Sequence, residues 1–215
     1  MSHATAGKFE QLCRKAVKCR WCFTELSLKA PTIDIAQPRW IGRTYWAARP
    51  RVLVLIVNPG SGEGRKDDPA DKDARRLIRA FSKGRGTLRA ITEHFKRDAK
   101  GWGGGRFKGF YSTDLGLAFE DTAFANVAWC STCGNRHPPR MLERCFSRHT
   151  EYLLRILEPQ IVLLSGGGTH RFQTRIAKLL PQAKIITMLH FAHREGGAAW
   201  DREKLRIRRQ IEKTG

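Results

Sequence analysis

The feature that most constrains the fold is an uninterrupted apolar run at residues 52–57, Val-Leu-Val-Leu-Ile-Val. Six β-prone residues without polar alternation predict a strand buried on both faces, as in a parallel α/β sheet. The run stops at Asn58-Pro59-Gly60, where proline has no N–H for the sheet and glycine permits a sharp turn. Asn58 therefore stands at the carboxyl end of a core strand, where open α/β sheets bind their ligands. The alternative is a turn without chemistry.

Helical patterns and further apolar runs alternate along the rest of the chain. Further strands are predicted at residues 123–129, 160–164 and 184–188. Helices are predicted at residues 8–19, 71–83, 87–96 and 200–213, and a long helix is predicted from Pro138 to Pro159. Another helix follows Ser165-Gly166-Gly167-Gly168 and ends at residue 180. This alternation predicts a three-layer α/β/α fold around a central four-stranded parallel sheet, with residues 1–215 forming a single domain.

The charge balance indicates the class of partner. Forty Lys and Arg residues against twenty Asp and Glu residues give a formal net charge of +20. An excess of this size, spread through the chain, predicts a polyanionic partner, and nucleic acid is the first candidate. A merely solvated surface needs much less charge. No apolar segment is long enough to span a membrane and residues 1–7 lack a signal-peptide core, so we expect a cytoplasmic protein.

Four motifs at the predicted strand ends, in this order, resemble the uracil-DNA glycosylase superfamily. Val57-Asn58-Pro59-Gly60 is similar to the first motif of mismatch-specific and single-strand-selective members. Phe124-Ala125-Asn126-Val127 falls where the middle strand carries the asparagine that reads the base. Cys130-x-x-x-Gly134-Asn135-Arg136-x-Pro138 resembles a loop of the iron–sulfur members. His190 lies where the second motif begins, although Phe-Ala follows it in place of Pro-Ser.

The resemblance implies a monofunctional DNA glycosylase that hydrolyses the N-glycosidic bond of uracil, or of a modified pyrimidine, flipped out of DNA. Asn58 would orient a water toward the sugar C1′, because an amide oxygen accepts a hydrogen bond but is no strong base. His190 would donate a hydrogen bond to O2 of the departing base, with His193 as the substitute. In efficient uracil-specific relatives an aspartate occupies the position of Asn58, so the asparagine predicts slow turnover.

Base recognition would involve three kinds of residue. Asn126 would pair with the base edge, because an amide both donates and accepts. One of the aromatic residues Phe107, Phe110 and Tyr111, with Phe110 as our assignment, would stack on the base. Gly60 stands where uracil-specific relatives place a tyrosine, so larger C5 substituents would enter. This suggests a second possible activity, removal of bulky hydroxymethylated or glucosylated cytosines from phage DNA as a defence.

DNA-backbone contacts are expected from Asn135, Arg136, Gly167 and Arg194. Gly167 belongs to Ser165-Gly166-Gly167-Gly168, which is either a phosphate seat at a helix N-terminus or a tight turn. DNA, single- or double-stranded, is the expected partner, and we expect a monomer that contacts no membrane. A DNA-binding α/β domain without catalysis is the alternative from another functional class.

The cysteines suggest a metal centre rather than disulfides. Cys19-x-x-Cys22, followed far downstream by Cys130 and Cys145, resembles the ligand set of the iron–sulfur glycosylases and implies a structural [4Fe–4S] cluster. The alternative is a tetrahedral zinc site in which Cys133 replaces Cys145.

Overall fold

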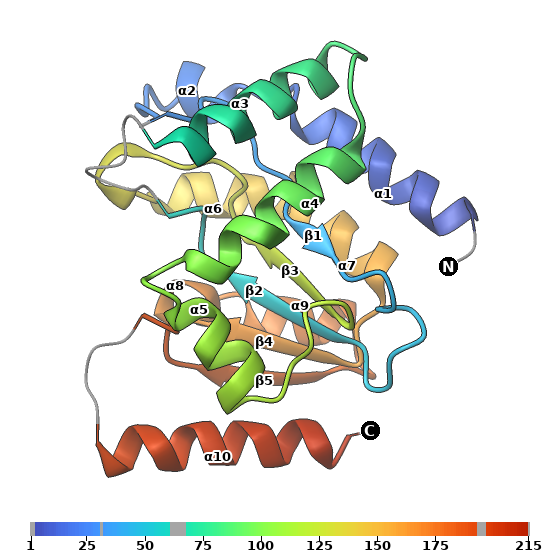
Figure 1. Ribbon diagram of the computed structural model, residues 1–215, viewed down its shortest axis with the longest axis vertical. Helices are drawn as coiled ribbons and strands as arrows, with labels where there is room; N and C mark the ends of the chain where they lie inside the picture. Colours follow the sequence, from blue (N-terminus) through green and yellow to red (C-terminus); the bar gives the residue numbers. More distant parts are fainter. Residues whose placement is uncertain (1–2, 31, 61–67, 193–196, 215) are drawn as a thin grey trace. The chain divides into compact units, whose positions relative to one another are not determined.

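The computed structural model describes residues 3–30, 32–60, 68–192 and 197–214, and within them five strands form one sheet in the order β1-β3-β2-β4-β5 (Figure 1). The strands are β1 (Trp40–Ile41), β2 (Val52–Ile56), β3 (Thr122–Asn126), β4 (Ile161–Ser165) and β5 (Lys184–Met188). The α/β class predicted from the sequence is confirmed.

The sheet is mixed and contains a fifth strand, β1, that the sequence did not predict. β2 pairs with β4 and β4 pairs with β5 in the parallel sense, with Val52 opposite Ile161 and Ile161 opposite Lys184. β1 pairs with β3 in the antiparallel sense, with Trp40 opposite Phe124. The sequence did not reveal β1 because two residues are too few to show a period of two.

The chain divides into two compact units, each built from three stretches of sequence. The first unit comprises residues 1–39, 57–95 and 125–156, and the second comprises residues 40–56, 96–124 and 157–215. β3 begins in the second unit, and its last residues, Ala125 and Asn126, belong to the first.

The second unit is organised around buried strands and aromatic rings. Every residue of β2 and β4 is buried, as the unbroken apolar runs predict. The ring of Phe107 is fully buried and lies 4.8 Å from the ring of Tyr111 and 5.0 Å from that of Phe191, measured between centroids. The helical segments of this unit are η1 (Ala99–Gly101), α5 (Arg106–Lys108), η2 (Gly109–Asp114), α8 (Gly167–His170), α9 (Gln173–Leu179) and α10 (Ala198–Glu212).

The first unit is mainly helical. Its helical segments are α1 (His3–Ala16), α2 (Trp21–Thr24), α3 (Pro69–Ser82), the first eight residues of α4 (Leu88–Asp98), η3 (Cys133–Asn135), α6 (Pro139–Cys145), η4 (Phe146–Thr150) and all but the last residue of α7 (Glu151–Leu157). α3 begins where Asp68 accepts a hydrogen bond from Ala70 N over 2.9 Å and proline occupies the first turn. Arg75 and Arg79 on this helix both pair with Asp34, which ties the segment before β1 to α3.

Within the described residues, every helix is too short or too polar to span a membrane.

Candidate functional site

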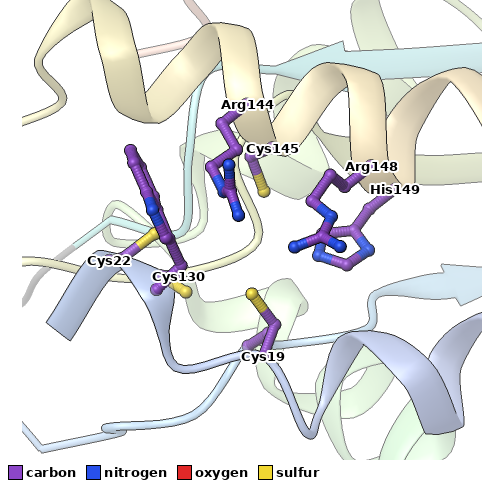
Figure 2. A pocket seen from close by; sticks show the side chains of 9 residues that line it. Cys19, Cys22, Cys130, Arg144, Cys145, Arg148 and His149 are labelled. Carbon is purple, nitrogen blue, oxygen red and sulfur yellow. The ribbon is translucent and has the colours of Figure 1, made fainter. Parts of the chain in front are cut away.

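Four of the six cysteines line one pocket in the first unit. Cys19 lies between α1 and α2, and Cys22 lies on α2. Cys130 follows β3, and Cys145 ends α6. Figure 2 shows the thiols of all four pointing into the same space. The structure therefore places the four cysteines expected to bind the cluster around one pocket, although they come from three separate segments of the chain.

The other two cysteines have different surroundings. Cys133 is exposed in η3, and Cys13 is buried in α1, where burial raises the pKa of its thiol. The pocket is lined by Cys145, and Cys133 is not among its lining residues. The pocket is thus lined by all four cysteines of the cluster hypothesis and by three of the four in the zinc alternative.

The pocket thiols differ in how readily they lose a proton. The hydrogen bond between the side chains of Cys22 and Cys130 lowers the pKa of Cys22 and raises that of Cys130, which burial raises further. Burial also raises the pKa of Cys145, although Trp129 N donates a hydrogen bond to its Sγ over 3.2 Å. Of these three thiols, Cys22 is the one that gives up its proton first, and thiolates are the form that binds metal.

The spacing of the sulfurs bears on the kind of metal centre. Among the described residues, no group of three or more His, Cys, Asp and Glu side chains lies close enough to hold one metal ion. A tetrahedral zinc site with Zn–S bonds of about 2.3 Å needs sulfurs about 3.8 Å apart. In a [4Fe–4S] cluster each thiolate binds a different iron, so the four sulfurs lie farther apart. A compact mononuclear site is therefore not preformed in the part of the chain that the structure describes.

Three side chains next to Cys145 show whether the pocket suits a cluster. Arg144, Arg148 and His149 line the same pocket from α6 and η4 (Figure 2). The Nδ1 atom of His149 is buried without a hydrogen-bond partner, which is costly unless an acceptor or donor meets it. A cluster held by four thiolates carries negative charge and exposes sulfur acceptors to its surroundings. It would offer His149 a partner and the two guanidiniums a counter-charge, so these residues fit the group.

The ionisation of His149 is compatible with that role. Burial, together with the charges of Arg148 and Arg144, lowers the pKa of His149 to about 4. The ring is therefore neutral near pH 7 and carries one N–H. Its only described ring neighbour is Trp129, with ring centroids 5.7 Å apart.

Two buried asparagines lie at the ends of neighbouring strands. Asn58 is 5% exposed and Asn126 is 4% exposed. Val57 O accepts a hydrogen bond from Ala128 N over 2.8 Å, so the chain after β2 runs beside the chain after β3 within the first unit. The structure thus groups Asn58 with Asn126 in the first unit.

The amide of Asn58 has a defined orientation. Its Nδ2 donates to Pro59 O over 3.2 Å, which turns the amide oxygen away from that carbonyl. The oxygen is the acceptor that a water-positioning role requires.

The amide of Asn126 is also oriented by a neighbour. Arg39 Nε donates to Asn126 Oδ1 over 3.0 Å, and the guanidinium of Arg39 lies 4.4 Å from the centroid of the Phe95 ring. Thr150 Oγ1 lies 3.0 Å from Asn126 O and 2.9 Å from Val127 O, so η4 supports the backbone that carries this amide.

His190 lies in the second unit, directly beyond β5. Its Nδ1 accepts a hydrogen bond from Ala192 N over 3.2 Å, and burial lowers its pKa below the ordinary 6.5. The ring is therefore neutral near pH 7, with the proton on Nε2, where it can be donated. His190 packs against Gly166, because a Cβ built on that glycine would lie 3.4 Å from the Cβ of His190.

The three aromatic candidates for base stacking are buried in the second unit. Phe107 and Tyr111 are fully buried, and Phe110 is 4% exposed. The ring of Phe110 stacks on that of Trp200 with an interplanar angle of 7° and centroids 5.4 Å apart. One face of Phe110 is therefore already covered by Trp200.

The remaining predicted site residues are placed as follows. Asn135 and Arg136 are exposed in and after η3, and Gly167 begins the one-turn helix α8 in the second unit. A Cβ built at Gly60 would meet none of the described atoms within 4 Å. Arg194 and His193 lie outside the described residues.

Comparisons with known proteins give no further constraint. No family model matches the chain, and no curated protein is significantly similar to it in sequence.

Sequence reasoning missed three residues that the structure places at these sites. Arg39 and Thr150 hold Asn126, and His149 lines the cysteine pocket. Arg39 is separated from Asn126 by 87 positions, so no local pattern connects them. His149 was visible only as one apolar-face position of a helix, four residues after Cys145.

Proposed function

We propose that the chain is a monofunctional DNA glycosylase of the uracil-DNA glycosylase superfamily, which hydrolyses the N-glycosidic bond of a pyrimidine flipped out of DNA. The main support is that Asn58 and Asn126, two buried amides, end neighbouring strands whose backbones are joined by the bond between Ala128 N and Val57 O. Buried amides at strand ends suit recognition of a small polar ligand better than they suit a core.

Asn58 would position the attacking water. Its Nδ2 is held by Pro59 O, and its oxygen would accept a hydrogen bond from a water directed at the sugar C1′. The amide has no titratable group, so it would supply orientation rather than charge. Cleavage develops positive charge on the sugar, which a neutral amide stabilises only weakly, and we therefore expect slow turnover.

His190 would stabilise the departing base. Negative charge accumulates on the base as the bond breaks, and a hydrogen bond aimed at O2 strengthens as it does. In the neutral ring the proton is on Nε2, so this N–H can donate a hydrogen bond to O2 of the base. Water would supply the hydroxyl that bonds to C1′, the base would leave with the electron pair of the broken C1′–N bond, and the remaining proton of the water would pass through solvent to the departed base.

Cys19, Cys22, Cys130 and Cys145 would hold a [4Fe–4S] cluster. When bound, such a cluster supplies a covalent cross-link rather than a reaction step. These cysteines would join the segment at α2 to the loop after β3 and to α6. Zinc at Cys19, Cys22, Cys130 and Cys133 is the alternative, and metal analysis of purified protein separates the two: iron and sulfide with broad visible absorption, or zinc without colour.

Gly60 favours a second candidate substrate. A Cβ at this position would meet no described atom within 4 Å, and the resemblance makes this the position at which the tyrosine of uracil-specific relatives would block C5 of the base. This supports removal of hydroxymethylated or glucosylated cytosines, the bases of modified phage DNA, in defence rather than repair.

The partner would be DNA, bound by a monomer in the cytoplasm. The net charge of +20 supports binding to a polyanion, and Asn135 and Arg136 are exposed where they can reach a phosphate. A DNA-binding domain that has lost catalysis shares these features, so binding alone does not distinguish the two.

Base release from oligonucleotides that each contain one test base provides the test. The panel comprises uracil, a thymine mismatch, 5-hydroxymethylcytosine and glucosylated 5-hydroxymethylcytosine. We expect release of at least one base by the native chain and at least about a hundredfold slower release by Asn58→Ala. Gln173→Ala removes an exposed amide from α9 and should behave as the native chain. Inactivity on every base, or equal rates for native and Asn58→Ala proteins, would refute the activity.

A further inference from the structure

The hydrogen bond between Arg39 and Asn126 restricts what the asparagine can recognise. A guanidinium has N–H donors and no acceptor, so the atom of Asn126 that faces Arg39 Nε at 3.0 Å must be the carbonyl oxygen. The Nδ2 group of Asn126 is thereby turned to the opposite side. An asparagine without such a neighbour can exchange its oxygen and nitrogen by rotating the amide, whereas this one is held in one orientation.

The position of Arg39 is itself well defined. Its guanidinium lies over the ring of Phe95, 4.4 Å from the centroid, and it is partly buried. Asn126 is 4% exposed, and its backbone carbonyl is within hydrogen-bond distance of Thr150 Oγ1. A charged donor on one side and a supported backbone on the other leave the amide little freedom to rotate.

The consequence follows from the edges of the two pyrimidines. Uracil presents N3–H as a donor beside its O4 acceptor, whereas cytosine presents N3 as an acceptor beside its amino group. Because the Oδ1 of Asn126 already faces a guanidinium, the amide offers mainly its N–H group to the base. This N–H group can donate to N3 of cytosine, whereas in uracil it would face the N3–H, which is another donor.

We infer that Arg39 is a positioning residue that fixes Asn126 as a hydrogen-bond donor and thereby makes the site prefer cytosine-type over uracil-type base edges. This inference rests on the proposed function, since it requires that Asn126 contacts the flipped base. It deepens that function by naming the base edge and the residue that selects it.

The test uses two bases that differ only at this edge. 5-Hydroxymethylcytosine and 5-hydroxymethyluracil are placed in the same oligonucleotide, and kcat/KM for base release is measured for each. We expect the native chain to favour the cytosine form by at least about tenfold, the discrimination typical of one well-formed base contact. Arg39→Met keeps an apolar stem against Phe95 but releases the amide, so this ratio should fall toward one, mainly because the uracil form gains.

Two further variants separate specificity from folding. Arg14→Met is the matched control, because the Arg14 guanidinium also lies 4.4 Å from a phenylalanine centroid, that of Phe81, and its side chain pairs with Glu10. It should leave the ratio unchanged. Arg39→Leu, which also lacks a donor, should lower the ratio as Arg39→Met does, and it serves if the methionine variant fails to fold.

A binding measurement separates failure of this inference from failure of the proposed function. Oligonucleotides with the same two bases on 2′-fluoroarabinose, which resists cleavage, are titrated against each protein. A Kd ratio that favours cytosine and falls by about tenfold in the Arg39 variants supports the inference even if no base is released. A native ratio of one or one that favours uracil would overturn it. So would a native ratio that persists in the Arg39 variants, or an equal change in Arg14→Met.

Discussion

Replacement of Thr150 by valine tests the support behind Asn126. The Thr150 side chain is fully buried, and its Oγ1 accepts a hydrogen bond from Trp129 Nε1 over 3.1 Å. The hydroxyl donates its single proton to the carbonyl of Asn126 or of Val127, at 3.0 Å and 2.9 Å. Valine has nearly the same shape without the hydroxyl. The indole N–H would therefore be stranded in the interior, and a carbonyl would lose its donor.

The expected cost can be worked from these two losses. A stranded buried donor costs about 1–3 kcal/mol and a lost hydrogen bond about 0.5–1.5 kcal/mol. Thr150→Val should therefore lower the free energy of unfolding by about 2–4 kcal/mol. In a chain of this length a loss of about 3 kcal/mol lowers Tm by about 6–12 °C. Because Thr150 also holds the backbone of Asn126, KM for base release should rise.

The assay is denaturant and thermal unfolding of the native chain and three variants. Thr92→Val makes the same chemical change where Thr92 Oγ1 donates to Arg89 O on the surface of α4, and it should change stability by less than about 0.5 kcal/mol. Thr150→Ser keeps the hydroxyl and should recover most of the loss. If Thr150→Val and Thr92→Val had equal stabilities, the structural role assigned to Thr150 would be wrong.

Four other outcomes are expected. Asn58→Asp should raise the rate of uracil release about tenfold, measured in single turnover, because a carboxylate stabilises the cationic sugar. The rate of the native chain should be constant above pH 7 and fall only at more acidic pH than an ordinary histidine would give, because burial lowers the pKa of His190 and protonation takes the lone pair that its Nδ1 offers to Ala192 N; His190→Asn should remove this limb. The same shift makes folding stability fall with pH below 6.5, because the unfolded chain then binds the proton more readily, and chemical denaturation at several pH values should show it. Cys145→Ser should abolish iron binding and visible absorption, whereas Cys133→Ser should retain both.

The central strands could be predicted from sequence because a strand buried on both faces has an unbroken run of apolar residues. Residues 52–56 and 161–165 are buried at every position, and unbroken apolar runs mark such strands without any knowledge of the fold. β1 was not predicted because its two residues are too few to show a strand pattern. Its position depends on pairing with Phe124 and Ala123, which lie more than eighty positions away in the chain.

The site residues were predictable where chemistry is encoded locally. The cysteines have a recognisable spacing, and Asn58 follows a strand directly, so both were visible as candidates. The orientation of side chains was not. The bond from Arg39 to Asn126 and the unpartnered Nδ1 of His149 both result from tertiary packing, which a single sequence does not report. Phe110 illustrates the same limit, because its stacking on Trp200 depends on the position of α10.

The most direct measurement is isotope incorporation during base release in water enriched in oxygen-18. The panel oligonucleotides are incubated with the native chain, and the free base and the abasic product are analysed by mass spectrometry. A monofunctional glycosylase whose Asn58 orients water predicts an intact free base without heavy oxygen and an abasic sugar that carries no protein adduct. Absence of any released base, or a covalent sugar–protein adduct trapped by borohydride, would contradict it.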